Sequence, residues 1–80
     1  MHDERIHVRV YSGYKAGERP TDFELNGEEV VVIEILDMWL EENFADRQRK
    51  RFFVVKGNDG NTHKIYLDEK TGEWFLRKRA

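Results

Sequence analysis

The sequence predicts an all-β domain, and three observations carry that prediction. Apolar and polar residues alternate near the start of the chain, and two turn dipeptides, Asn26-Gly27 and Asp59-Gly60, each separate runs of β-branched and aromatic residues. Such alternation is typical of half-buried strands, and such dipeptides are typical of hairpin turns. We therefore expect five or six short antiparallel strands in meander order. They should form a strongly bent sheet or partly open barrel of SH3-like or OB-like size.

The first expected strand covers residues 4–12. Here Ile6, Val8 and Val10 alternate with basic side chains, so one face should be buried and the other solvated. Residues 13–20 follow and include two glycines and the only proline of the chain. Because these residues interrupt regular structure, we expect a loop there.

The next expected element is a hairpin centred on Asn26-Gly27. Both residues tolerate the positive φ angles that a type I′ turn requires. With these two residues as the loop, Phe23 lies opposite Val30 across the ladder. An apolar pair at this position supports the register.

The stretch NGEEVVVIEILDMWLEE, which contains this turn, fits two secondary structures. Its helical interpretation rests on apolar residues three or four apart, namely Ile33, Leu36, Leu40 and Phe44. Its strand interpretation rests on the β-branched run at 30–33, on the turn that leads into it, and on the absence of a good N-cap. We expect one strand over about 28–38, partly buried on both faces, followed by a turn or irregular loop. A short helix near 37–47 remains the alternative.

The clearest hairpin covers residues 50–69. If Asp59-Gly60 forms a two-residue loop, apolar residues face one another at three cross-strand pairs: Val54 with Ile65, Phe52 with Leu67, and Phe53 with Tyr66. A final strand is expected in EWFLRKR, residues 73–79. No linker or internal repeat divides the chain, so we expect a single domain over residues 1–80.

The composition indicates a small folded domain that depends on its core. Eighty residues are close to the lower limit for a domain without covalent cross-links, and the chain contains no cysteine. Its 14 basic and 16 acidic residues give a net charge of −2, which disfavours a dedicated nucleic-acid binder. No apolar run approaches the ~20 residues that cross a bilayer, and no secretory leader is recognisable. We expect a soluble, cytoplasmic protein that does not contact membranes.

No arrangement of catalytic or metal-binding residues is recognisable. The three histidines, His2, His7 and His63, lack the spacing of a metal motif, and Ser12 lacks the surroundings of a nucleophile elbow. Adjacent carboxylates such as those at 41–42 would point to opposite faces of a strand, which makes them poor acid–base pairs. We therefore expect no enzymatic activity, no metal and no cofactor.

Basic residues gather in two places, RQRKR at 47–51 and RKR at 77–79, with aromatic residues nearby. Cationic tracks beside aromatic platforms are how small β-barrels bind single-stranded nucleic acid. The candidate contacts are Arg47, Arg49, Lys50, Arg51, Phe52, Trp74, Arg77, Lys78 and Arg79. The competing interpretation is that the cations guard an aromatic strand against aggregation. The expected register also places the two clusters at opposite ends of the hairpin, about 20 Å apart at ~3.3 Å per residue.

The order of motifs from Pro20 onward resembles a family. It consists of N-G-E-E-V-V-V-I-E-I-L-D-M-W, then R-F-F-V-V-K-G-N-D-G, then G-E-W-F-L. The matching residues are Pro20, Phe23, Gly27, Val32, Leu36, Trp39, Phe53, Val55, Asp59, Gly60, Tyr66, Trp74 and Leu76.

The chain resembles a small bacterial all-β family of unknown function, which occurs alone and as a C-terminal appendage of some Y-family error-prone DNA polymerases. The resemblance implies an all-β fold and supports a strand over 28–38. It implies no catalytic residues. The acidic pair at 28–29 stands where the family pattern leads us to expect basic residues, which weakens a DNA-binding role for this hairpin.

Two functional hypotheses follow from the sequence. The first is a non-enzymatic domain that binds another protein through a sheet edge or an aromatic face. A monomer is favoured, but the sequence leaves the oligomeric state open. The alternative is an accessory domain for single-stranded DNA or RNA, linked to DNA repair or replication. The position and exposure of the basic and aromatic residues in the folded chain discriminate between them.

Overall fold

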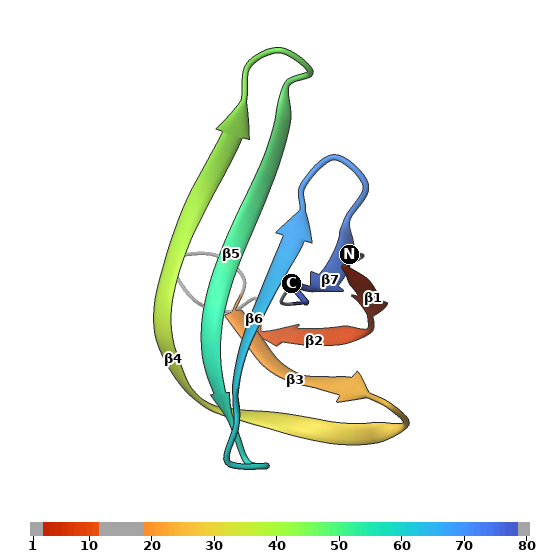
Figure 1. Ribbon diagram of the computed structural model, residues 1–80, viewed down its shortest axis with the longest axis vertical. Helices are drawn as coiled ribbons and strands as arrows, with labels where there is room; N and C mark the ends of the chain where they lie inside the picture. The colour runs from red at the N-terminus through yellow and green to blue at the C-terminus, as the bar shows by residue number, and fades with distance from the viewer. Residues whose placement is uncertain (1–2, 12–18, 79–80) are drawn as a thin grey trace.

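The computed structural model describes residues 3–11 and 19–78, and these residues form seven strands and no helix (Figure 1). The strands are β1 (Glu4–Ile6), β2 (Val8–Tyr11), β3 (Arg19–Leu25), β4 (Glu28–Asn43), β5 (Gln48–Gly57), β6 (Thr62–Asp68) and β7 (Glu73–Leu76). All pairings are antiparallel, which confirms the all-β class. The expected number of strands was too low because the first expected strand is divided at His7 into β1 and β2.

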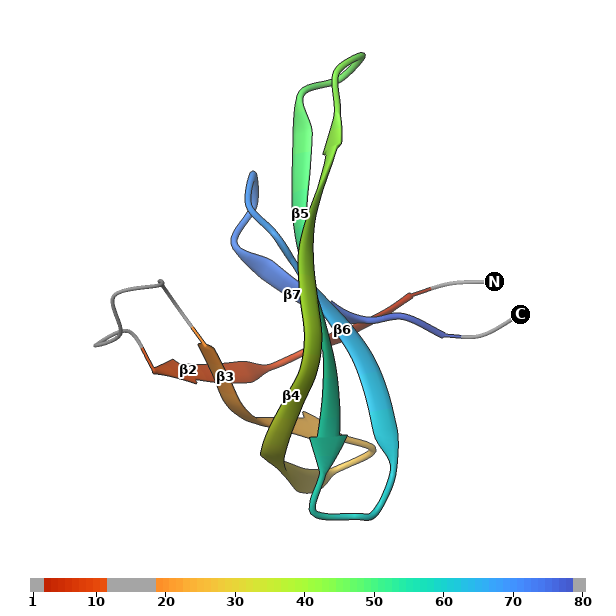
Figure 2. The ribbon, with the colours of Figure 1, turned by 90° about the vertical axis from the view of Figure 1, so that its left-hand side faces the viewer.

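The sheet has the order β1-β7-β6-β5-β4-β3-β2, so its two edge strands are neighbours in sequence. Only His7 separates β1 from β2, and the His7 carbonyl accepts a hydrogen bond from the amide of Glu24 at 3.2 Å. The sheet therefore curls until its two edges meet at one corner (Figures 1 and 2). A partly open barrel of this kind is what the sequence predicted.

The first hairpin has the expected turn and register. Asn26 and Gly27 have φ angles of 53° and 80°, and Phe23 pairs with Val30. Arg19 and Pro20, which were expected to lie in the loop over 13–20, already belong to β3. Proline is tolerated at the beginning of a strand, where its missing amide is not needed for the ladder. Residues 12–18 lie outside the described part of the chain.

The strand interpretation of the ambiguous stretch is correct, and the alternative helix near 37–47 is wrong. β4 continues to Asn43 because β5 pairs with it from Val32 to Asn43. Only residues 44–47 form a turn. The register with β5 shifts twice, between Val32 and Glu34 and between Ile35 and Asp37. Each shift inserts an extra residue and offsets the alternation by one position. These offsets explain why the apolar residues of a strand had a nearly helical spacing.

The β5–β6 hairpin is present, but its predicted register was wrong by one residue. Phe52 pairs with Tyr66 and Phe53 with Ile65, instead of with Leu67 and Tyr66. The loop is formed by three residues, 58–60, of which only the last has a positive φ angle, 83°. Gly57 and Asn61 close this loop, since the Gly57 amide donates a hydrogen bond to the Asn61 carbonyl at 2.9 Å. A three-residue loop that ends in glycine is the next most common hairpin connection after the two-residue loop.

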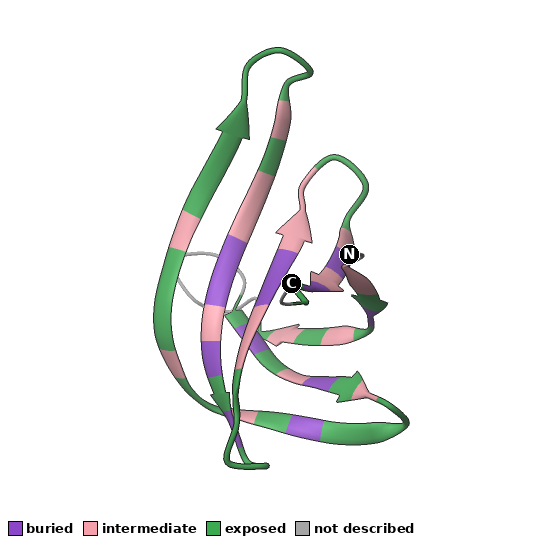
Figure 3. Ribbon diagram, in the orientation of Figure 1, coloured by how far each residue is buried: buried purple, intermediate pink, exposed green. Residues whose placement is uncertain are grey.

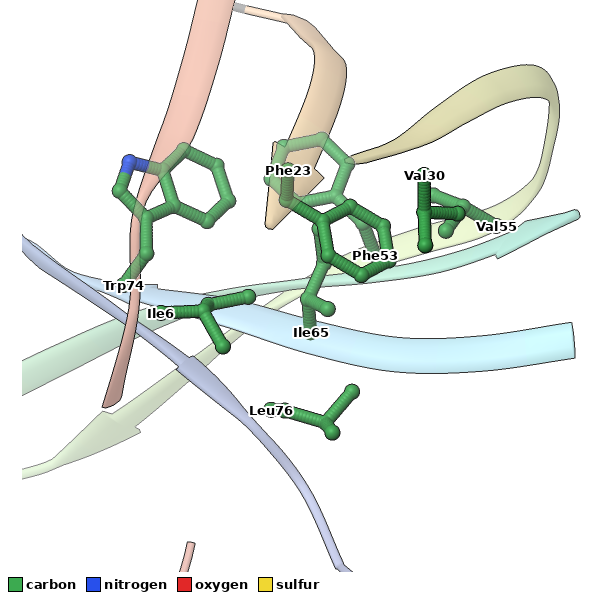
Figure 4. Close-up of a cluster of buried hydrophobic side chains, with 8 residues drawn as sticks. All are labelled: Ile6, Phe23, Val30, Phe53, Val55, Ile65, Trp74 and Leu76. Carbon is green, nitrogen blue, oxygen red and sulfur yellow. The ribbon is translucent and has the colours of Figure 1, made fainter. Parts of the chain in front are cut away.

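The core lies on the concave, inner face of the curled sheet (Figure 4), and its residues are spread over several strands (Figure 3). Its buried residues are Ile6, Phe23, Val30, Phe53, Val55, Ile65, Trp74 and Leu76. They come from six strands, and Phe53, Val55 and Ile65 have no exposed surface at all. Each fully buried side chain of this size contributes about 1.5–3 kcal/mol. The inner face of the sheet is thus stabilised by one apolar cluster inside the curl.

Candidate interaction surfaces

Four aromatic side chains form a row across the outer face of the sheet, opposite the core. We call Trp39, Phe52, Tyr66 and Phe75 the aromatic row; they are consecutive cross-strand partners on β4, β5, β6 and β7. Neighbouring ring centroids are 5.3, 4.8 and 5.2 Å apart along the row. These distances are typical of favourable aromatic pairs, so the row stabilises the outer face as a second layer.

Three cations cover the aromatic row. The Lys64 ammonium lies 5.0 Å from the Trp39 ring centroid, the Arg77 guanidinium lies 5.1 Å from that of Phe52, and the Lys50 ammonium lies 5.3 Å from that of Tyr66. Cations within about 6 Å of a ring face are attracted by its quadrupole. The central ring, Phe52, is consequently 0% exposed, which leaves no free face on which a nucleobase could stack.

The hydroxyl of Tyr66 donates a hydrogen bond to the Asp3 carboxylate. Burial raises the pKa of this hydroxyl, and the neighbouring Asp3 carboxylate raises the pKa further. Arg77 also lies near Asp3, at 3.5 Å between guanidinium and carboxylate. The segment just before β1 is thereby connected to the outer face.

The basic cluster at 47–51 does not form one surface. Arg47 lies exposed in the turn after β4, with a positive φ angle of 57°. Arg49 and Arg51 contact the Glu69 carboxylate, at 3.8 and 2.9 Å. Lys50 points to the opposite face of β5, toward the Tyr66 ring, because neighbouring strand residues alternate between faces. Two of the four predicted cations are therefore neutralised by an acidic side chain.

The second predicted cluster is also divided. Arg77 lies over Phe52 and Tyr66, whereas Lys78 forms an ion pair with Glu4 at 2.9 Å. Trp74 belongs to the core and is 8% exposed. Arg79, like Ser12 and His2, lies outside the described residues. The fold thus brings together one cation from each cluster, Lys50 and Arg77, over the same tyrosine ring.

The aromatic row was not recognised from the sequence, although Phe52 was a candidate contact. With the predicted two-residue loop, Phe52 faced Leu67, so the row that joins Phe52 to Tyr66 could not be seen. The correct loop has glycine as its third residue, and counting three loop residues in NDG would have placed Phe52 opposite Tyr66. Trp39 was missed because its strand was expected to end at residue 38.

The second surface is the outer edge of β4. β3 pairs with β4 only as far as Val31, and no other described strand pairs with this edge from there to Asn43. We call the segment formed by residues 37–49 the arm; its far end extends beyond the rest of the sheet, where β6 no longer pairs with β5 (Figures 1 and 2). Along the arm the pairing of β4 with β5 is regular, without a bulge.

The open side of β4 is both apolar and acidic. Its exposed large apolar residues, together with the one in the following turn, are Ile33, Leu36, Met38, Leu40 and Phe44. Phe44 is 87% exposed. The strand also carries six acidic residues and no basic one; the acidic residues are Glu28, Glu29, Glu34, Asp37, Glu41 and Glu42. Contiguous exposed apolar side chains are a mark of interaction surfaces.

A polar cluster stabilises the β5–β6 loop. The Asp59 carboxylate accepts a hydrogen bond from the Asn61 amide at 3.0 Å and lies 2.9 Å from the His63 Nε2. The Asn61 amide and then His63 lower the pKa of Asp59. Within residues 3–11 and 19–78, no three histidines or carboxylates lie close enough to hold a metal ion, and no helix could span a membrane.

No family model, curated protein or solved structure matches this chain. The resemblance to the bacterial all-β family, and with it any link to DNA polymerases, stays a prediction from the sequence.

Proposed function

We propose that this chain is a non-enzymatic protein-interaction domain and that the open edge of β4 is its binding surface. The observation that carries the proposal is the coincidence of an unpaired strand edge with large exposed apolar side chains on the same strand. An unpaired edge offers backbone amides and carbonyls to an extended segment of another protein. The side chains of the edge strand then supply the apolar contacts.

Along residues 37–43 the edge lacks most of the devices that shield edge strands, and charge is the one that it keeps. Proteins shield edge strands with bulges, prolines, charges or a very short length. β4 has two bulges, but both precede Asp37, and the seven residues from there to Asn43 pair regularly with β5. This part of the edge is therefore flat enough, and long enough, to accept another strand.

The alternative function, binding of single-stranded nucleic acid, would use the outer face. The cations over the aromatic row favour it, since Lys50, Lys64 and Arg77 lie together. Against it, Phe52 and Tyr66 are 0% and 5% exposed, and stacking on them would require the cations to leave the rings. We therefore place the protein partner ahead of nucleic acid.

Site-specific photocrosslinking tests the proposal. A photoreactive phenylalanine analogue is introduced at Leu40 or Phe44 on the arm, and at the exposed Lys70 in the β6–β7 turn as the control. In the native host we expect the arm positions, and not position 70, to form a crosslink to one defined protein segment. That segment, prepared as a peptide, should bind the purified domain. Equal crosslinking from all three positions, or crosslinks only between copies of this chain, would contradict the proposal.

A further inference from the structure

We infer that the segment bound by the arm is an extended strand in which basic residues alternate with apolar residues. This inference rests on the proposed function and specifies the chemistry of the partner. It is drawn from the two faces of the part of β4 between Asp37 and Asn43, where the ladder is regular.

Side chains of this part of β4 alternate between two different surroundings. Asp37, Trp39 and Glu41 lie on the outer face, because Trp39 belongs to the aromatic row. Met38 and Leu40 lie on the inner face, because Met38 pairs with the core residue Phe53. Over residues 37–41, one face of the open edge is therefore acidic around an indole ring, and the other is apolar; beyond them Glu42, on the inner face, pairs with Arg49 at 3.8 Å.

A strand added to this edge would lie about 4.8 Å away, with its own side chains aligned with those of β4. On the outer face its side chains would stand beside Asp37, Trp39 and Glu41. Lysine or arginine suits all three positions, because Asp37 and Glu41 stand directly beside two of them and are diagonal neighbours of the third, beside Trp39, whose ring already has the Lys64 ammonium 5.0 Å away. On the inner face its side chains would stand beside Met38 and Leu40, where apolar residues fit. Five successive residues of the partner should therefore read basic, apolar, basic, apolar, basic.

The carboxylates on the outer face have no cationic partner that would compete with such a strand. The Asp37 carboxylate accepts a hydrogen bond from the Met38 amide at 2.9 Å, and the Glu41 carboxylate accepts one from the Trp39 indole at 3.0 Å. Neither carboxylate forms an ion pair with any described residue. Lys50 is the cross-strand partner of Glu41, but it lies on the β5 side and points toward Tyr66. The open flank of β4 is thus negative and unneutralised.

The same charges disfavour a second copy of the chain as the occupant. An arm that paired with another arm would bring its own acidic residues to an edge that is already acidic, and like charges across strands are destabilising. The carboxylates would thus prevent self-pairing and select a basic partner at the same time. Nucleic acid is excluded from this edge for the same reason.

Three seven-residue peptides with solubilising Gly-Ser ends test the inference: alternating Lys-Val, Thr-Val and Glu-Val. Binding is followed by amide-resolved NMR titration at low and at physiological salt. We expect the Lys-Val peptide to shift the amides of residues 37–43 and to bind about tenfold more tightly than the Thr-Val peptide. This difference should shrink as the salt concentration rises. The Glu-Val peptide should bind more weakly than either.

A charge-reversed pair of variants provides the control. In Asp37→Lys/Glu41→Lys the preference should invert, so that the Glu-Val peptide binds more tightly than the Lys-Val peptide. In Glu28→Lys/Glu29→Lys, which has the same net charge but alters the part of β4 that is paired with β3, the original preference should remain. If the lysine variant does not fold, Asp37→Asn/Glu41→Gln should remove the preference without reversing it.

The outcomes separate this inference from the proposed function. Equal binding of the Thr-Val and Lys-Val peptides at residues 37–43 would overturn the basic alternation and leave binding along the β4 edge intact. Equal loss of Lys-Val binding in both charge-reversed variants would show attraction to net charge alone and would also overturn it. If no peptide shifts residues 37–43 and the photocrosslinks are absent as well, the proposed function fails with it. A concentration-dependent dimer that shifts these amides without peptide would identify a second copy as the occupant.

Discussion

The arm and the curled part of the sheet contain the same kind of antiparallel ladder, yet they are stabilised differently. In the curled part the inner face encloses Phe23, Val55 and Ile65, each at most 2% exposed. In the arm both faces of β4 meet water, and no residue of 37–43 is buried (Figure 3). The comparison teaches that hydrogen-bonded pairing alone does not make a region of a sheet stable, because two paired strands without a buried face are only marginally stable.

The largest expected effect comes from comparing one substitution in the two regions. Phe53→Ala, in the core, should lower the free energy of unfolding by about 3–5 kcal/mol. Phe44→Ala, at the end of the arm, should change it by less than about 0.5 kcal/mol, because that ring is 87% exposed. Denaturant midpoints of the purified variants measure both.

A loss of such size approaches the total stability of a small domain. Phe53→Leu, expected to cost less, keeps the core measurable if the alanine variant does not fold. Comparable losses at positions 53 and 44 would mean that the arm is packed in solution, and the contrast between the two regions would be lost.

A second test probes the tight packing of the curled part. A Cβ atom at Gly57 would lie 2.5 Å from the Val30 Cγ1 and 2.7 Å from the Asp59 Oδ1, closer than such atoms approach one another. Gly57→Ala should therefore lower the free energy of unfolding by about 1–3 kcal/mol. The loss should be smaller in a Val30→Ala background, which removes the clashing methyl group. Purely additive losses in this double-mutant cycle would argue that the strain arises elsewhere.

Shortening the arm should have a smaller effect. Leu40 and Arg51 face one another across the ladder, so residues 41–50 can be replaced by Asn-Gly as a two-residue turn. The replacement removes no buried side chain, but it removes the ion pairs of Arg49 with Glu42 and Glu69, the hydrogen bond from Trp39 to Glu41 and the Lys50 cation over Tyr66. Because these interactions lie at the surface, we expect the free energy of unfolding to fall by only about 1–2 kcal/mol, as measured by thermal and chemical denaturation. A loss similar to that of Phe53→Ala would show that the arm supports the core.

The smallest effect is confined to alkaline pH. Burial and Asp3 raise the pKa of Tyr66 above its ordinary value of 10.0, so the folded state holds the phenol proton more tightly than the unfolded state does. The resulting stabilisation is fully present below pH 10.0 and is lost as the pH rises above it. Tyr66→Phe should weaken this loss, which denaturant midpoints from about pH 9 to pH 11 would measure. Identical pH profiles for both proteins would contradict the assignment.

The sequence predicted the positions of strands and turns better than it predicted the register between neighbouring strands. Asn26-Gly27 requires positive φ angles at two positions, so it determined both the turn and the pairing of Phe23 with Val30. The sequence at 58–60 suits a two-residue and a three-residue loop, and only the fold decides between them. A shift of one residue in the register changes which β5 side chain lies on the same face as Tyr66: Phe53 was predicted there, and Phe52 is found there. The aromatic row was therefore missed.

The open edge that we propose as the interaction surface was harder to predict, for a different reason. The open edge exists because β3 pairs with β4 only as far as Val31 while β5 follows it to Asn43. The lengths of three strands determine this difference, and no local pattern encodes it. The apolar residues at 33, 36 and 40 were noticed for their spacing, but the spacing favoured the wrong helix, because bulges had shifted a strand pattern.

The corner at His7 also constrains the order in which the chain can fold. β1 pairs only with β7, so Glu4 meets Leu76, near the other end of the chain. During synthesis β1 is made long before its partner, and the barrel cannot close until β7 has left the ribosome. Local hairpins such as β3–β4 can form early, because few residues separate their strands. Closing the barrel must bring together β1 and β7, which are far apart in sequence, so this step has a larger entropic cost. Folding should therefore be slow for a chain of this size, with β1 the last strand to become protected.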